Sequence, residues 1–164
     1  MKIYKLADNT IDSKDYVNMI DFLKKRNHLT QSKITQKFES SFSKFLKTKY
    51  SIFVNSGSSA NLLIAQTLLE GNYLKNKVVV LPAVSWSTTV SPFLQLGFKV
   101  ILCDSDENNL GLSIKHLQKI CKNYNPGLVG VVNVLGHSNN FSEILKLKKK
   151  YNFRLIEDNC ESMG

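Results

Sequence analysis

The sequence predicts an α/β protein with a mostly parallel sheet that helices cover on both faces, which is a three-layer α/β/α sandwich. From about residue 50 onward, five short apolar runs alternate with four helix-like segments. Such alternation is typical of βαβ units. Two of the runs, 78–81 and 129–132, are apolar at nearly every position instead of at every second one. This pattern indicates strands that are buried on both faces.

The residues before position 50 have a different pattern and predict two helices. Ile34, Phe38, Phe42 and Phe45 recur at spacings of three and four residues, which is typical of an amphipathic helix. A shorter segment, 15–23, has similar spacing. We therefore divide the chain into an N-terminal helical segment, 1–50, and an α/β part, 51–164.

The α/β part is expected to contain strands at 51–54, 77–81, 99–103, 127–134 and 153–156. The intervening helices are expected at 58–70, 86–96, 113–123 and 141–151. Gly71 and Asn72 end the first of these helices, and Ser113 is a plausible cap for the third. Pro92 falls inside the second helix, where it predicts either an interruption or a late start.

Composition limits the possible classes of protein. The 164 residues suffice for a domain with a core, and no apolar run approaches the roughly 18 residues that cross a bilayer. The N-terminus lacks the apolar stretch of a secretory signal. The three cysteines are widely spaced and odd in number, so neither a disulfide framework nor a metal site is expected. These features favour the cytoplasm, with no role at a membrane.

The formal net charge of +9 raises the hypothesis of a basic nucleic-acid-binding module. Most lysines fall on the polar faces of predicted helices, and no stripe combines cations with exposed aromatic residues. We therefore expect no nucleic-acid partner and keep this class only as an alternative. A dinucleotide-binding domain is a third hypothesis, but the Gly-x-Gly-x-x-Gly signature is missing after the first predicted strand.

Three segments carry candidate chemistry. In 55–61, Gly57 permits a tight turn before a helix whose free N–H groups suit a phosphate, although Ser58 could simply cap that helix. Trp86, the single tryptophan, follows a strand and could stack on a planar ring or lie in the core. Asp158 ends the last strand, where its carboxylate could pair with a cationic ring nitrogen, cap the next element or meet a lysine.

The order of these segments resembles the DegT-type family of sugar aminotransferases, which have the aspartate aminotransferase fold. The resemblance extends from about residue 29 to 164 and rests on 55–60, 82–86, 97–106, Gly136 and 156–164. It implies a large domain of that fold, incomplete here, with pyridoxal 5'-phosphate as cofactor. It also implies a nucleotide-linked keto-sugar as substrate, glutamate as an amino donor, a homodimer, and a role in polysaccharide biosynthesis.

The resemblance assigns roles to particular residues. Gly57 and Ser58 would hold the cofactor phosphate, Trp86 would stack on the pyridine ring, and Asp158 would pair with the ring nitrogen. Glu161 stands where the family usually has Gln or His near the phenolic oxygen. An ionised glutamate cannot donate a hydrogen bond to a phenolate, so this departure leaves its role open.

The run 157–161 and the segment 55–63 are also similar to the family's sugar 3-dehydratase branch, which acts on nucleotide-linked 4-keto-6-deoxyhexoses. In that branch a histidine replaces the Schiff-base lysine. No lysine here matches that position, so we expect no catalytic residue in this chain. We further expect a fragment without the C-terminal small domain, inactive alone. An aminotransferase is the main hypothesis and a dehydratase the alternative.

Overall fold

The computed structural model describes residues 9–163, which fall into two compact units, one ending at Phe53 and one beginning at Val54. In the first unit, helix α1 spans Ser13–Lys24 and helix α2 spans Lys33–Leu46. The Asp12 side chain caps α1 by accepting hydrogen bonds from the N–H groups of Lys14 and Asp15. The two helices expected before residue 50 are therefore present.

The second unit holds the sheet. Its strands are β1 (Val78–Pro82), β2 (Lys99–Cys103), β3 (Leu128–Val132) and β4 (Arg154–Asp158), in the spatial order β2-β1-β3-β4, and every pairing is parallel. The helices are α3 (Gly57–Glu70), α4 (Ser87–Gln95), α5 (Ile114–Tyr124) and α6 (Phe141–Tyr151). A short 3-10 turn, η1 (Val134–Gly136), follows β3.

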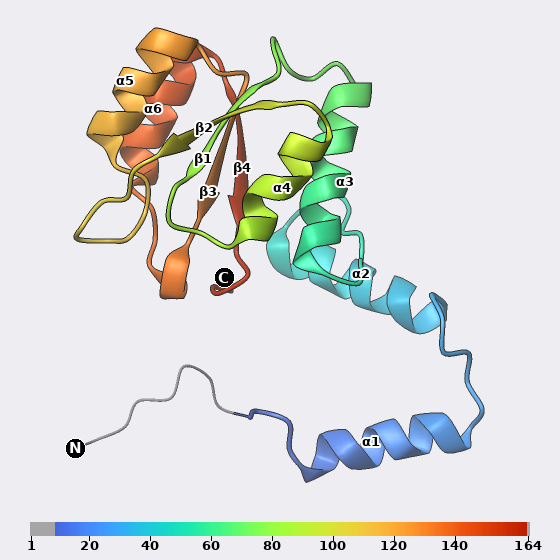
Figure 1. Ribbon diagram of the computed structural model, residues 1–164. Helices are drawn as coiled ribbons and strands as arrows, with labels where there is room; N and C mark the ends of the chain where they lie inside the picture. The colour runs from blue at the N-terminus through green and yellow to red at the C-terminus, as the bar shows by residue number, and fades with distance from the viewer. Residues whose placement is uncertain (1–8, 164) are drawn as a thin grey trace, which may run out of the picture. The chain divides into compact units, whose positions relative to one another are not determined.

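Helices α3 and α4 cover one face of the sheet, and α5 and α6 cover the other (Figure 1). On the α3–α4 face, Val79 and Leu81 pack with Ala65 and Phe93. On the opposite face, residues of β1 and β3 pack with residues of α5 and α6: Val80, Val129, Val131, Leu117 and Ile144. The strands alternate their side chains between two apolar layers, which confirms the predicted three-layer sandwich.

The strand expected at 51–54 is absent, and this prediction was wrong. The backbone N–H of Phe53 donates to the Glu39 carboxylate at 2.8 Å, and its carbonyl accepts from the Gln31 amide at 3.4 Å. These backbone groups therefore bond to side chains instead of to a neighbouring strand, and Ile52 remains 70% exposed. An apolar run becomes a strand only where another strand completes its hydrogen bonds.

The remaining predicted elements are present with small shifts at their ends. Ser113 caps α5 as expected, since its hydroxyl accepts from the N–H of His116 at 3.4 Å. Pro92 neither ends nor delays α4, because the helix runs from Ser87 to Gln95 around it. The carbonyl that Pro92 leaves without an intrahelical donor belongs to Thr88, and it accepts from the Asn61 side chain at 3.4 Å.

Candidate active site

The carboxyl edge of the sheet is the expected place for a ligand. The chain leaves β1 through α4 toward β2 on one side, and it leaves β3 through α6 toward β4 on the other. The connections therefore diverge between β1 and β3, and such a switch point opens a crevice at the strand ends. The N-termini of α3 and α4 lie at this same edge, low in Figure 1.

The start of α3 presents free hydrogen-bond donors. Ser56, not Ser58, is the N-cap, because its hydroxyl accepts from the N–H of Ser59 at 3.1 Å. The alternative in which Ser58 caps the helix was therefore wrong. Within residues 9–163, the backbone N–H groups of Gly57 and Ser58 have no acceptor. Two free N–H groups, a nearby hydroxyl and the positive end of a helix dipole favour an anion such as phosphate.

Trp86 is on the surface. It occupies the N-cap position of α4, and 77% of its surface is exposed. The alternative of a core tryptophan was therefore wrong. A large aromatic side chain that remains uncovered at the edge of a sheet, next to a helix start, is available to stack on a planar ligand.

The hydrogen bond from Asn61 to Thr88 ties the two helix starts together. Asn61 lies in the first turns of α3 and is only 8% exposed, and Thr88 belongs to the first turn of α4. The side-chain amide of Asn61 donates to the carbonyl of Thr88, to which Pro92 cannot donate because proline has no N–H. Sequence reasoning missed this link, although an asparagine on one helix facing a proline-containing helix could have suggested it.

Asp158 lies at the tip of β4 and is half-buried. One carboxylate oxygen, Oδ1, accepts from the N–H of Cys160 at 3.0 Å, and the other has no partner among the described residues. A small cavity of about 10 Å³ brings Asp158 together with Asn61 of α3 and Thr89 of α4. Gly57, Ser58 and Trp86 do not line this cavity, but they belong to the same two helix starts.

Glu161 has a local structural partner. Its Oε2 atom accepts from the N–H of Leu135 at 2.6 Å, which links the loop after β4 to the turn after β3. Leu135 has a positive φ of 52° and Gly136 one of 78°. The bond therefore holds a strained turn. His137 follows this turn and is exposed.

An asparagine cluster lies beside Asp158, and sequence reasoning missed it. Asn133, 6% exposed, donates through Nδ2 to Glu157 at 2.6 Å and to Asn159 at 2.7 Å. Its backbone N–H donates to the carbonyl of Asp158 at 3.2 Å. Asn133 thus bonds to three consecutive residues centred on Asp158. Asparagines directly after the apolar runs of β3 and β4 were the available signal.

Asn139 completes the cluster from the start of α6. It is 4% exposed, and its N–H and Nδ2 both donate to Oδ1 of Asn133, at 3.2 and 3.0 Å. Nδ2 also donates to the carbonyl of Val132, and Oδ1 accepts from the N–H of Leu112. The amide of Asn133 therefore uses both of its N–H bonds and both acceptor positions, so its orientation is fixed.

Cys160 is not activated as a nucleophile. Partial burial, followed by the neighbouring carboxylate of Asp158, raises the pKa of the thiol to about 11. Because the thiolate is the reactive form, this side chain reacts only slowly near neutral pH. Within residues 9–163, no group of His, Cys, Asp and Glu side chains could hold a metal ion, and no helix has the length and apolarity to cross a membrane.

Comparison with known proteins identifies related enzymes. The GDP-4-keto-6-deoxy-D-mannose 3-dehydratase of Escherichia coli O55:H7 is 37% identical over 98% of this chain and 42% of its own length. The UDP-4-amino-4,6-dideoxy-N-acetyl-beta-L-altrosamine transaminase of Campylobacter jejuni serotype O:2 is 29% identical over 96% of this chain and 41% of its own length. The chain thus spans about two fifths of these relatives.

Solved structures agree with the fold. The E. coli GDP-4-keto-6-deoxy-D-mannose-3-dehydratase with bound hydrated PLP has a TM-score of 0.85 and 35% identity, over 100% of this chain and 42% of its own. Helicobacter pylori PseC, an aminotransferase of pseudaminic acid biosynthesis, has the same TM-score of 0.85 at 23% identity, over 99% of this chain and 43% of its own, and supports the fold alone. A family model matches residues 10–164, and the chain belongs to the DegT/DnrJ/EryC1/StrS aminotransferase family.

Proposed function

We propose that the full-length protein is a pyridoxal-phosphate-dependent enzyme that acts on a nucleotide-linked 4-keto-6-deoxy sugar. The observation that carries this proposal is that Asp158 lies beside the starts of α3 and α4, at the carboxyl edge of the sheet and at its switch point. Three separate segments of the sequence converge where ligands bind in such sheets. The family and the relatives support the same reading.

The residues at this edge fit the cofactor chemically. The N–H groups of Gly57 and Ser58 and the hydroxyl of Ser58 suit its phosphate, and the exposed ring of Trp86 suits its flat face. The carboxylate oxygen of Asp158 that has no described partner suits the protonated ring nitrogen. When bound, pyridoxal phosphate supplies an electron sink that stabilises negative charge on a neighbouring carbon.

The part of this chain in that chemistry is to hold and orient. Asp158 keeps a proton on the ring nitrogen because a nearby opposite charge favours the cationic form. Asn133 holds the side chains of Glu157 and Asn159 on either side of Asp158, and its backbone N–H holds the carbonyl of Asp158, so the end of β4 that carries the carboxylate is kept in place. Glu161, which is engaged with the turn at Leu135, shapes the neighbouring loop and donates no proton to the cofactor.

Between the two reactions of the family, we favour 3-dehydration. The relatives with the higher identities, 37% and 34%, are both GDP-4-keto-6-deoxy-D-mannose 3-dehydratases. The transaminases follow at 24–32% identity. Aminotransfer to a keto-sugar remains the second candidate, and the residue at the Schiff-base position of the full-length protein, histidine or lysine, distinguishes the two.

The reaction test uses the full-length protein with glutamate and GDP-4-keto-6-deoxymannose, followed by mass spectrometry of the nucleotide sugar. A dehydratase yields a product that lacks the 3-hydroxyl oxygen but keeps the keto group. An aminotransferase yields a product with an amino group in place of the keto oxygen. If neither product forms with cofactor-loaded protein, the substrate assignment is wrong.

The cofactor test uses the variant Asp158→Asn. We expect the affinity for pyridoxal phosphate to fall and the absorbance band of the bound cofactor to change, because the neutral amide no longer favours a protonated ring. Asp106→Asn, in the loop after β2, is the matched control and should leave the band unchanged. An unaltered band in Asp158→Asn would remove the proposed pairing.

Three further properties belong to this proposal by analogy. One relative is a lipopolysaccharide biosynthesis protein of Salmonella typhimurium, which supports a role in surface polysaccharide synthesis. A homodimer and a cytoplasmic location follow from the same family reasoning. Sedimentation of the full-length protein would test the dimer, since a monomer at micromolar concentration would exclude it.

A further inference from the structure

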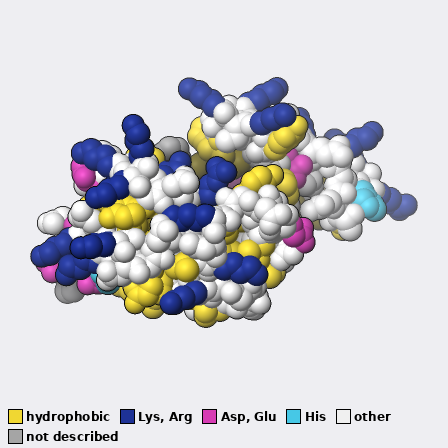
Figure 2. Space-filling view, turned by 90° about the horizontal axis from the view of Figure 1, so that it is seen from above, with side chains coloured by type: hydrophobic (Ala, Val, Ile, Leu, Met, Phe, Trp, Pro, Cys, Tyr) yellow, Lys and Arg dark blue, Asp and Glu magenta, His cyan; other side chains and the backbone are white. Residues whose placement is uncertain are grey.

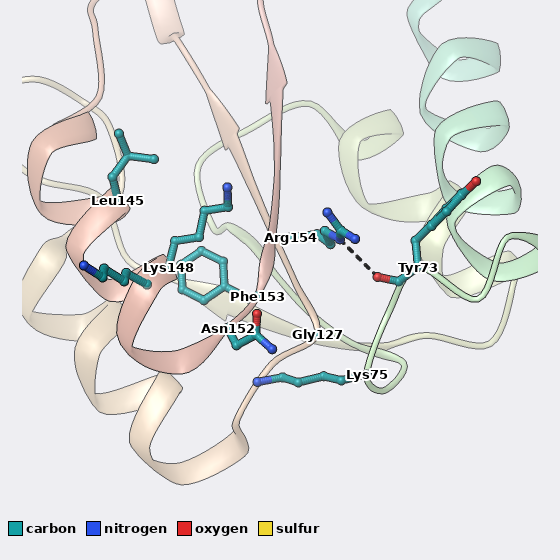
Figure 3. Close-up of a pocket in the computed structure, with 9 residues that line it drawn as sticks. Tyr73, Lys75, Gly127, Leu145, Lys148, Asn152, Phe153 and Arg154 are labelled. Carbon is teal, nitrogen blue, oxygen red and sulfur yellow. Dashed lines mark hydrogen bonds between the residues drawn. The ribbon is translucent and has the colours of Figure 1, made fainter.

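A second cavity lies at the amino edge of the sheet, opposite the candidate active site. It has a volume of about 530 Å³ and is formed by the segments that enter β1, β3 and β4 together with the end of α6. Its base includes Phe153, which is 2% exposed, and Leu145 forms part of its wall (Figure 3). A cavity of this size can hold a small molecule.

Four cations and no carboxylate line this cavity: Lys75, Lys148, Lys149 and Arg154. Among the described residues none of the four forms an ion pair, and the ion pair on α6 joins two other residues, Lys146 and Glu143. Figure 2, which views the molecule from the side of this edge, shows lysine and arginine side chains exposed there. The four cations of the cavity are therefore not neutralised by an ion pair within the described residues.

Two of the cations are held in place by neutral oxygens. Lys75 donates to the side-chain oxygen of Asn125 and to the carbonyl of Tyr151, and Arg154 donates through Nε to the carbonyl of Tyr73 at 3.2 Å (Figure 3). The terminal nitrogens of Arg154 have no partner among the described residues. Partial burial lowers the pKa of Lys75, as expected where no anion compensates the charge.

The favourable interaction of cations with the C-terminal end of the α6 dipole explains only part of this cluster of cations. Lys148 and Lys149 lie in the last turn of α6, where cations are favourable. Lys75 precedes β1 and Arg154 begins β4, so neither belongs to that helix. Elements distant in sequence therefore direct cations to one cavity, beyond what a single helix end requires.

We propose that this cavity binds a small polyanion of the diphosphate class, either free or as part of a nucleotide. The planar fork of Arg154 suits two phosphate oxygens, and the lysines suit a second phosphate group. The exposed side chain of Leu145 offers an apolar contact for the remainder of a nucleotide. The proposal is independent of the cofactor site, because the two cavities lie at opposite edges of the sheet.

The test is calorimetric titration of the full-length, cofactor-loaded protein with inorganic diphosphate and, separately, with GDP, at low and high salt. We expect saturable binding that the variant Arg154→Gln weakens by at least about tenfold. Arg154→Lys should give an intermediate affinity, since it keeps the charge but loses the fork. Binding that Arg154→Gln weakens belongs to this cavity, whereas GDP binding that this variant leaves unchanged belongs to the substrate site. If the Arg154-dependent binding is tighter for GDP than for diphosphate, the site is assigned to a nucleotide, and if it is equal, to a free anion.

Lys146→Gln is the matched control, because it removes one charge from the same helix outside the cavity. It should leave the affinity unchanged. The cofactor absorbance band reports that every variant is folded, so failure here is distinct from failure of the proposed function. Absence of saturable binding up to roughly millimolar anion, or equal weakening in Arg154→Gln and Lys146→Gln, would overturn the proposal.

Discussion

Replacing Asn133 by alanine tests how the end of β4 is held. Asn133 accepts two hydrogen bonds from Asn139 and donates to Glu157 and Asn159, so the substitution removes all four side-chain bonds at once. The consequences differ among the partners. Glu157 and Asn159 are exposed and can bond to water, whereas Asn139 is 4% exposed.

The magnitude follows from what Asn139 loses. Its Nδ2 atom keeps its hydrogen bond to the carbonyl of Val132 at 2.9 Å. Its backbone N–H, which donated to Asn133 at 3.2 Å, has no other acceptor. A buried donor without a partner costs about 1–3 kcal/mol. We therefore expect the amide of Asn139 to exchange about 5- to 150-fold faster with solvent deuterium, since protection measures the free energy of local opening.

Hydrogen exchange of the full-length protein at single-amide resolution is the assay, because it needs no two-state unfolding. Asn76→Ala is the matched control. Asn76 also bridges two segments, by accepting from the N–H of Val78 and donating to the carbonyl of Asn125, but at the opposite edge of the sheet. It should deprotect Val78 and leave Asn139 unaffected. Unchanged exchange at Asn139 in Asn133→Ala would refute the reasoning.

A second variant, Asn133→Asp, separates support of Asn139 from support of Asp158. It keeps an acceptor for Asn139 but replaces the two donors by a carboxylate oxygen that faces Glu157. Like charges at this distance repel. We therefore expect near-normal protection at Asn139 and a faster-exchanging amide at position 133, which donates to the carbonyl of Asp158.

The remaining predictions concern three other sites. Gly130→Val should destabilise the sheet by about 1–3 kcal/mol, because even a Cβ at Gly130 would lie 2.7 Å from a leucine side chain of β1. Denaturant titration measures this change, and an unchanged unfolding midpoint would contradict it. With a pKa of about 11, Cys160 should react slowly with a thiol reagent at pH 7 and faster as the pH approaches that value, and Asp158→Asn should speed the reaction at neutral pH; a rate that is flat with pH would count against the assigned pKa. Asn61→Ala should lower the free energy of unfolding more in the wild-type protein than in the Pro92→Ala variant, with a coupling energy of about 0.5–1.5 kcal/mol. The reason is that an alanine at position 92 has an N–H, which bonds the carbonyl of Thr88 in place of Asn61. Additive effects of the two substitutions on the free energy of unfolding would exclude the link.

Much of the fold was predictable because it depends on local and repeated patterns. Buried parallel strands are apolar at successive positions, and β1 and β3 are therefore recognisable from sequence alone. The error at 51–54 has a nonlocal cause. Whether an apolar segment forms a strand depends on a partner for its backbone, and here Glu39 and Gln31 provide those hydrogen bonds.

The candidate site was predictable in its position but not in its details. The topology alone places Gly57, Trp86 and Asp158 at one edge, since helices that precede or follow parallel strands have their N-termini there. Which serine caps α3 and whether Trp86 is buried depend on side-chain packing, which composition does not reveal. The role of Asn133 depends on Glu157 and Asn159, which are distant in sequence and meet Asn133 only in the folded chain.

The position of Glu161 near the cofactor stays a prediction, but its contact in the structure is defined. Its carboxylate accepts the N–H of Leu135, in a turn with positive φ. Glu161→Ala removes that acceptor and leaves the turn supported only by its own backbone hydrogen bonds, so this variant should loosen the loop. Glu161→Gln can still accept from the N–H of Leu135 and should preserve the loop. Exchange of the Leu135 amide distinguishes the two: faster exchange in Glu161→Ala alone would establish the side chain as a loop anchor, and equal exchange in both variants would return it to the candidates for direct cofactor contact.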